Sequence, residues 1–281
     1  QVLKAINFDL KNTVFSYIPN TAETAFLGML QGLEDYLSAK RKDILIDNKP
    51  HMGDIEELLS FRPRVEKIVL KDAKLRTFIT DDEHRDELVA HVYDTTYEVI
   101  KKDVDTLVIL DDSIVRGTTL EKSILTMLSR LKPKKVVIVS SAPQIRFPDC
   151  YGIDMSKMSE FVAFRAMIAL IKEKGKEYLL EEVLDRCKLA LDENLNVNEV
   201  NRLYEEFAYE EISNKIGEIV KPEEMRADLE IIYQTVDNLH KACPDHLGDW
   251  YFTGNFPTRG GMRVTNRSFV NDMEGKLVRA Y

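Results

Sequence analysis

The sequence has few cysteines, and none of them stands close to another. Cys150, Cys187 and Cys243 are the only three among 281 residues, and no CxxC motif occurs. Metal sites built from cysteine need thiolates at short spacings along the chain. The pattern therefore argues against a cysteine metal site, and unpaired thiols suit a reducing compartment, so we expect a cytoplasmic protein.

The sequence also lacks a long apolar run and an excess of positive charge. No apolar stretch approaches the roughly 20 residues of a membrane-spanning helix, and the opening QVLKAINFDL has no features of a secretory signal. Lys and Arg number 39 against 48 Asp and Glu, a net charge of -9. Because nucleic-acid binding needs a concentrated positive face, we expect neither a membrane nor a nucleic-acid partner.

Apolar strands alternate with helical patterns in the first half of the chain. Phe26, Leu30 and Leu33 recur at helical spacing after the first strand. The run VVIVSSA is apolar almost throughout, which is typical of a strand buried on both faces. This alternation predicts an α/β fold with a parallel sheet flanked by helices. The expected strands are 13–18, 66–70, 106–110 and 136–142, with helices following the first strand and over 84–101 and 120–131.

The second half of the chain has a different pattern. After about residue 159 it reads as helices with acidic outer faces, including one that begins at Pro222 and continues to Cys243. The tail carries aromatic, Gly and Pro residues and predicts an irregular segment. We therefore expect an α/β domain at 1–175, a helical appendage at 176–245 and a C-terminal segment at 246–281 that packs back on the first domain.

The stretch VILDDSIVRGTT, residues 108–119, ends the third expected strand and begins a helix. In open parallel sheets, ligands bind beyond the carboxyl ends of the strands. Gly117 would let the backbone approach a ligand, and amides at a helix N-terminus accept phosphate. Asp111 and Asp112 would repel that phosphate unless ribose hydroxyls or Mg²⁺ lay between them. The stretch predicts a site for a sugar phosphate with metal, the alternative being a capped turn rich in Asp and Ser.

The same stretch resembles the phosphoribosyl-pyrophosphate (PRPP) loop of type I phosphoribosyltransferases, in the form found in amidophosphoribosyltransferases. Four more stretches resemble that family. They are PNTAETA (19–25), similar to its pyrophosphate loop, LRTFI (75–79), the end of its flexible loop, SSAPQIRFPDCYGIDM (140–155) and YFTGNFPT (251–258). The resemblance implies a type I phosphoribosyltransferase fold with the PRPP-binding domain at 1–175, whereas the helices at 176–245 match poorly.

The resemblance also implies roles for single residues. Asp111 and Asp112 would hold the ribose hydroxyls and Mg²⁺, with Thr21 near the metal, and Arg76 would close over the pyrophosphate. A solvated loop cation is the alternative for Arg76. The catalytic set is then Arg76, Asp111 and Asp112, and the loop around the 5-phosphate consists of Ser113, Ile114, Val115, Arg116, Gly117, Thr118 and Thr119.

The implied reaction is displacement of pyrophosphate from PRPP by ammonia, giving 5-phosphoribosylamine for purine biosynthesis. Mg²⁺ and Arg76 would neutralise the departing pyrophosphate, and closure of the loop 71–85 would exclude water. Because ammonia is already a nucleophile, we expect no general base. By resemblance we also expect purine nucleotides as inhibitors and a homo-oligomer.

Two features depart from the family. Its full-length enzymes carry an N-terminal glutaminase domain that begins with a catalytic cysteine, whereas no cysteine lies near Gln1. We expect such a domain either upstream in a longer polypeptide or absent, with free ammonia as donor. Some relatives hold an iron–sulfur cluster, but Cys150 is one residue out of register and Gly248 and Tyr251 stand at two other ligand positions. We expect no cluster, since four thiolates are needed.

Two other functions stay open from the sequence. One is a phosphoribosyltransferase that uses a nucleobase. The other is a PRPP-binding regulatory module without catalysis, which would tolerate loss of Arg76.

Overall fold

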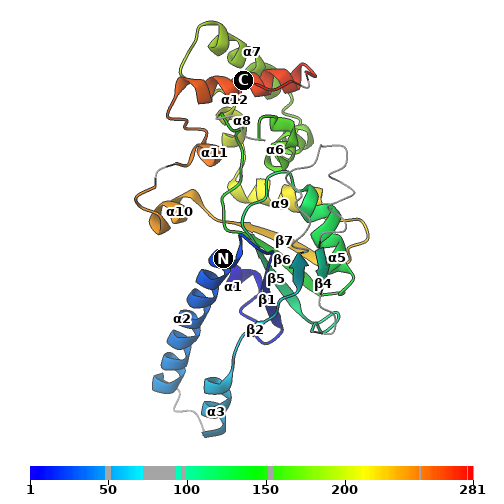
Figure 1. The fold of residues 1–281 in the computed structure, drawn as a ribbon, viewed down its shortest axis with the longest axis vertical. Helices are drawn as coiled ribbons and strands as arrows, with labels where there is room; N and C mark the ends of the chain where they lie inside the picture. The colour runs from blue at the N-terminus through cyan, green and yellow to red at the C-terminus, as the bar shows by residue number, and fades with distance from the viewer. Residues whose placement is uncertain are drawn as a thin grey trace.

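The computed structural model describes residues 1–47, 52–71, 93–95, 99–150, 155–246, 248–276 and 278–280. At its centre lies a five-stranded sheet with the order β2-β1-β5-β6-β7, in which every neighbouring pair is parallel (Figure 1). The predicted α/β architecture, a parallel sheet flanked by helices, is confirmed. The strands are β1 (Thr13–Tyr17), β2 (Arg64–Val65), β5 (Thr106–Asp111), β6 (Lys135–Ser140) and β7 (Asp228–Tyr233).

The two faces of the sheet are buried under different helices. Because successive strand residues point to opposite faces, Leu107 and Ile109 of β5 enter one apolar core and Val108 and Leu110 enter the other. This explains why the strands read as continuous apolar runs. One core is covered by α2 (Glu23–Asp47), and the other by η1 (Leu120–Leu125), α5 (Thr126–Ser129), α6 (Val162–Glu173) and α9 (Tyr209–Val220).

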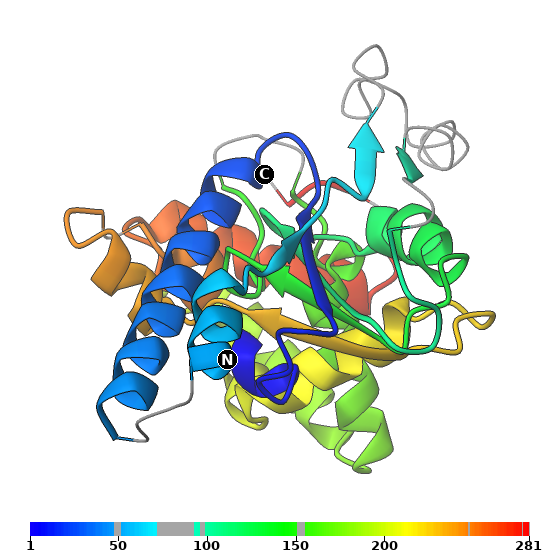
Figure 2. The same cartoon turned by 90° about the horizontal axis from the view of Figure 1, so that it is seen from below.

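Helix α2 is longer than the face it covers. Its residues up to 37 include the buried Phe26, Leu33 and Leu37, and the part that follows runs beside α3 (Met52–Ser60), as Figure 2 shows. Arg41 joins the two helices by donating to the carbonyls of Leu58 and Phe61 at 3.2 and 2.7 Å. A short α1 (Val2–Ala5) precedes β1.

The prediction for residues 66–101 is wrong in two places. Instead of one strand at 66–70, the chain forms β2 and then β3 (Val69–Lys71). Strand β3 pairs antiparallel with β4 (Tyr93–Thr95) in a separate two-stranded sheet. The predicted helix over 84–101 therefore does not hold at 93–95. The sequence there, VYDTTY, is rich in β-branched and aromatic residues, which favour a strand.

The helix predicted from Pro222 to Cys243 holds only at its end, where α10 (Val236–Ala242) forms. Pro222 lies in a turn, in which its carbonyl accepts a hydrogen bond from Met225 N at 3.0 Å. Strand β7 of the sheet follows. All six β7 residues pair with β6, and Ile231 and Tyr233 are buried. The appendage predicted at 176–245 therefore contributes an edge strand to the main sheet. How the chain divides into domains stays a prediction.

The C-terminal segment is helical rather than irregular. It contains α11 (Trp250–Thr253) and α12 (Arg259–Met273), after α10 (Val236–Ala242). Thr258 caps α12 by accepting from Gly261 N at 3.3 Å. Helix α12 packs on α7 (Tyr178–Asp192), at the top of Figure 1, and on η2 (Met158–Glu160). The described residues also form α8 (Asn201–Glu205).

In the part of the chain that the structure describes, the helices are too short or too polar to cross a lipid bilayer.

Candidate functional site

Three loops meet at the carboxyl edge of the sheet, where the sequence predicts a binding site. Tyr17 of β1 pairs with Leu110 of β5, and Asp111 pairs with Ser140 of β6. Backbone hydrogen bonds continue past the strand ends, from Ile18 N to Leu110 O at 2.8 Å and from Ser141 N to Asp111 O at 2.9 Å. The loops that follow β1, β5 and β6 are thereby fixed next to one another.

Asp111 and Asp112 lie at this edge, and both are half-buried. Asp112 N donates to Asp111 Oδ1 at 2.9 Å. The Asp112 carbonyl accepts from Ala142 N and from Ser141 Oγ, both at 3.1 Å. The pair is thus positioned by the loop after β6. Burial raises the pKa of Tyr233 on β7, and the charge of Asp111 adds to this shift.

The side chain of Arg116 is turned towards η2. Its Nη2 and Nε lie 2.7 and 2.9 Å from Oε2 of Glu160. Arg165 of α6 donates from Nη2 to the Arg116 carbonyl at 2.7 Å. Sequence reasoning missed Glu160 and Arg165, because they stand 44 and 49 residues further along the chain. Both residues hold the shape of the predicted phosphate loop.

Gly117 packs closely against two helices. It is buried with φ of +76°, and a Cβ there would lie 2.9 Å from Val220 Cγ1 and 3.3 Å from Val162 Cβ. The residue therefore lets the loop backbone approach α9 and α6. The expectation that its backbone also approaches a ligand stays a prediction. Val162 N also donates to the Val115 carbonyl at 2.9 Å.

The other residues of the predicted loop differ in how exposed they are to solvent. Ile114 is buried, Ser113 and Thr118 are half-buried, and Thr119 is exposed. Thr119 precedes η1, a π-helical turn, and its hydroxyl does not cap that helix. The loop thus reaches the protein surface at Thr119 and is anchored in the core at Ile114.

Thr21 and Arg76 are the two predicted site residues outside the loop 111–119. Thr21 is exposed in the turn between β1 and α2, beyond the same edge of the sheet, and the Pro19–Asn20 peptide bond before it is cis. Arg76, and the flexible loop 71–85 apart from Lys71 in β3, lie outside the described residues. The role of Arg76 therefore stays a prediction.

The donor set at this edge suits a cation that arrives with its substrate. No group of three or more His, Cys, Asp or Glu side chains is arranged as a metal site within the described ranges. Magnesium is commonly held by one or two carboxylates together with substrate phosphates and water. Asp111 and Asp112 at the strand end fit that requirement.

Comparison with known proteins identifies similar sequences over part of the chain. Amidophosphoribosyltransferase from Escherichia coli K12 is 51% identical over 57 residues, 20% of this chain and 11% of that protein. The Pasteurella multocida amidophosphoribosyltransferase is 42% identical over 80 residues, 28% of this chain and 16% of that protein. The chain thus matches less than a fifth of the length of these relatives, and the resemblance to amidophosphoribosyltransferases is confirmed.

No protein-family model matches the chain. Among solved structures, glutamine PRPP amidotransferase from B. subtilis, complexed with ADP and GMP, is 21% identical with a TM-score of 0.44. The similarity covers 88% of this chain and 38% of that one.

Proposed function

We propose that this chain carries out the phosphoribosyl transfer of an amidophosphoribosyltransferase. Ammonia would displace pyrophosphate from C1 of PRPP and give 5-phosphoribosylamine. The observation that carries the proposal is the position of Asp111 and Asp112 at the carboxyl end of a central parallel strand, beside two other loops. The local identity of 51% to a curated amidophosphoribosyltransferase supports the same reaction.

The proposed binding mode follows from the chemistry of the loop. The carboxylates of Asp111 and Asp112 would accept hydrogen bonds from the ribose hydroxyls, and Mg²⁺ would be held by these carboxylates and the pyrophosphate, near Thr21. The backbone of 113–119 would hold the 5-phosphate. The Arg116 side chain supports this assignment indirectly, because its ion pair with Glu160 keeps the loop in place.

The proposed reaction is a substitution at C1. The bond from C1 to the pyrophosphate oxygen breaks, the ammonia nitrogen bonds to C1, and a proton leaves the new ammonium group for solvent. Bound Mg²⁺ supplies charge neutralisation for the leaving group. Arg76 would contribute a second positive charge, and the half-buried carboxylates would keep the sugar oriented for attack.

A pyrophosphate-release assay with PRPP, Mg²⁺ and ammonium tests the proposal, with glutamine as an alternative donor in a parallel sample. We expect release with ammonium, and a loss of about 100-fold in Asp111→Asn and Asp112→Asn, because each removes a charged contact to the substrate. The matched control is Asp228→Asn. Asp228 is an exposed carboxylate at the opposite end of the sheet, on β7, and its replacement should leave the rate unchanged.

The other results of this assay point to the alternatives. PRPP binding without pyrophosphate release from ammonium or glutamine would favour a regulatory module. Release that requires a nucleobase would favour a nucleobase phosphoribosyltransferase. Absence of PRPP binding would contradict all three. We also propose that purine nucleotides compete with PRPP and that the chain forms a homo-oligomer. An inhibition series and light scattering test these two points.

A further inference from the structure

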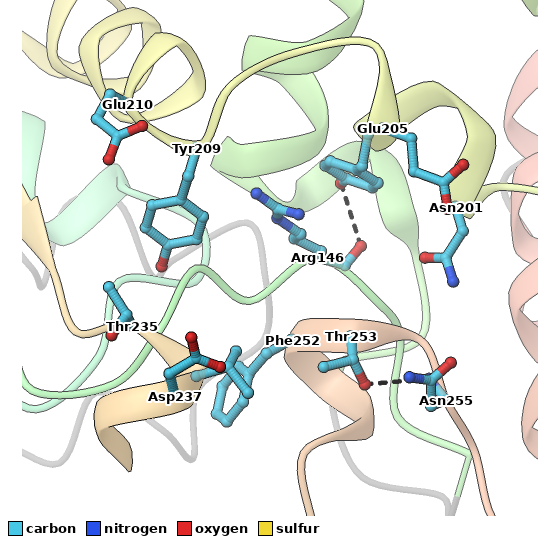
Figure 3. Close-up of a pocket in the computed structure, with 12 residues that line it drawn as sticks. Arg146, Asn201, Glu205, Tyr209, Glu210, Thr235, Asp237, Phe252, Thr253 and Asn255 are labelled. Carbon is cyan, nitrogen blue, oxygen red and sulfur yellow. Dashed lines mark hydrogen bonds between the residues drawn. The ribbon is translucent and has the colours of Figure 1, made fainter. Parts of the chain in front are cut away.

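A cavity separate from the loop 111–119 lies at the same edge of the sheet, beyond the ends of β6 and β7. It encloses about 520 Å³ and draws its lining from the loop after β6, the start of α9, the segment after β7, α8 and α11 (Figure 3). That volume is within the usual range for a small-molecule site. None of the residues 111–119 lines it, so its function does not depend on the proposed reaction.

The floor of this cavity is formed by Arg146. Its guanidinium lies against the rings of Tyr204 and Tyr209, 4.9 and 5.1 Å from their centroids (Figure 3). Nε and Nη2 both donate to one neutral acceptor, Oε1 of Gln144, at 3.0 and 2.8 Å. Within the described residues no carboxylate forms an ion pair with Arg146, and burial lowers the pKa of its guanidinium.

The orientation of this arginine is fixed by its neighbours. Gln144 cannot turn, because its Nε2 donates to the Tyr209 carbonyl at 3.0 Å and to Ser213 Oγ at 2.8 Å. The Tyr209 hydroxyl in turn donates to the Gln234 carbonyl at 2.9 Å. The planar guanidinium is therefore held in one position at the floor of an open cavity, which is how arginine recognises a carboxylate or phosphate.

The opposite charge lies at the mouth of the cavity. Glu205, Glu210 and Asp237 line it with exposed side chains, and all three are labelled in Figure 3. These carboxylates would repel a ligand with several negative charges. A ligand with one oxyanion and one ammonium group could pair its oxyanion with Arg146 and its ammonium group with these carboxylates.

We infer that the cavity binds a small zwitterion, with its carboxylate on Arg146 and its ammonium group among the carboxylates at the mouth. The aromatic rings that flank Arg146 keep water from the buried end, so the contact between guanidinium and carboxylate is stronger there than at an exposed site. The cation would then gain the anionic partner that its own chain does not provide in the described ranges.

Trp250 provides a direct measurement of binding. It is the single tryptophan of the chain, and it begins α11, whose Phe252 and Thr253 line the cavity. The full chain would be titrated with γ-aminobutyrate and ε-aminohexanoate, and with butyrate and hexanoate, which lack the ammonium group. We expect a saturable change in tryptophan emission, with at least one amino acid binding more tightly than its matching carboxylate.

Three variants test the assignment of the two ends. Arg146→Gln should weaken amino-acid binding at least about tenfold, since it removes a charge-assisted hydrogen bond. Arg202→Gln is the control, because Arg202 is an exposed arginine that does not line this cavity. Asp237→Asn should reduce the preference for the amino acid over the matching carboxylate that lacks the ammonium group. Because Asp237 is exposed, this substitution should leave the fold intact.

The inference would be overturned by unchanged binding in Arg146→Gln, by equal affinity for each amino acid and its carboxylate, or by no saturable signal in the wild type. If Arg146→Gln does not fold, the preference of Asp237→Asn for the amino acid over its carboxylate tests the inference instead. Loss of the preference supports the inference, and an unchanged preference overturns it.

Discussion

Gly117 is the residue of the predicted phosphate loop at which the structure leaves no room for a side chain. Its φ of +76° disfavours any other residue, and a Cβ would meet Val220 at 2.9 Å. We expect Gly117→Ala to lower the free energy of unfolding by about 1–3 kcal/mol, from backbone strain and overpacking. Urea unfolding followed by circular dichroism measures the change.

The chain contains a matched control for this substitution. Gly28 is exposed in α2, and a Cβ there would meet no atom within 4 Å. Gly28→Ala should raise the free energy of unfolding by about 0.5–1 kcal/mol, because alanine favours the helix. Equal stability of Gly117→Ala and the wild type would show that the loop does not pack on α9 and α6 as described.

The thiols of Cys187 and Cys243 are expected to differ in reactivity. Cys187 is buried, with its Sγ 3.6 Å from Asn266 Oδ1, and burial raises the pKa of its thiol to about 12. Cys243 is exposed. At about pH 8 a thiol reagent should therefore modify Cys243 in the folded protein and Cys187 only after unfolding. Mass spectrometry of the labelled peptides, with and without denaturant, measures this. Rapid labelling of Cys187 in the folded chain would contradict its burial.

The residues of the candidate site were predictable to different degrees. Asp111 and Asp112 could be placed because an apolar strand ends at them, and ligands gather at the carboxyl edge of parallel sheets. The contacts of Gly117 and Arg116 could not be predicted, because their partners Val220 and Glu160 lie far along the chain. Sequence spacing predicts local geometry, whereas such contacts depend on how whole elements pack.

The loop 111–119 is held by two elements that follow it, η2 and α6. If the proposed reaction is correct, removing the charge of Glu160 should loosen the loop through Arg116 and weaken PRPP binding. Because this ion pair is only half-buried, we expect an increase in KM of about 3-fold to 10-fold in Glu160→Gln, with little change in kcat. Steady-state kinetics measures both parameters.

Glu173→Gln serves as the control for that experiment. Glu173 ends α6 and pairs with Lys215 on the protein surface, so its replacement should leave KM unchanged. A rise in KM for both variants would indicate a general effect of lost surface charge, contrary to the proposed support of the loop by Glu160.

Helices α7 and α12 are joined by an ion-pair group that should respond to acid. Hydrogen bonds from Lys276 and Lys188 lower the pKa of Glu274 from 4.5 to about 2. A carboxyl group whose pKa is lower in the folded than in the unfolded protein stabilises the fold at pH values above its unfolded pKa. This contribution is lost as the pH falls from 4.5 to about 2. Glu274→Gln should therefore be less stable than the wild type at pH 7 and equally stable at about pH 2. Urea unfolding at both pH values measures this, and a difference that persists in acid would contradict it.

Secondary structure was predicted well where a single pattern dominated and badly where two patterns overlapped. The helix after β5 was predicted from Leu120, Ile124 and Leu128, which are all buried. In contrast, DLEIIY lies between polar turns within a stretch that also fits helical spacing, and it forms β7 because β6 has an open edge there. The pairing partner that decides between strand and helix is about 90 residues away, outside the reach of any local pattern.

At the scale of the whole molecule, the sheet is completed late in the chain. Strand β6 ends at Ser140, and its neighbour β7 begins only at Asp228, after α6, α7, α8 and α9. Helix α9 packs on both α6 and β7, and it buries Ile212, Ile216 and Val220. The α/β core therefore depends on residues beyond 175, where the sequence predicted the end of a domain.

A truncated chain of residues 1–175 tests this dependence. It would lack β7 and α9, so β6 would become an open edge and one face of the sheet would lose part of its apolar cover. We expect this fragment to bind a hydrophobic dye and to unfold without cooperativity, whereas the full chain keeps the complete sheet with its helices and should unfold cooperatively. Dye fluorescence and urea unfolding compare the two. Cooperative unfolding of residues 1–175 would show that the core closes without its last strand, and the sheet would then be independent of the helices that precede β7.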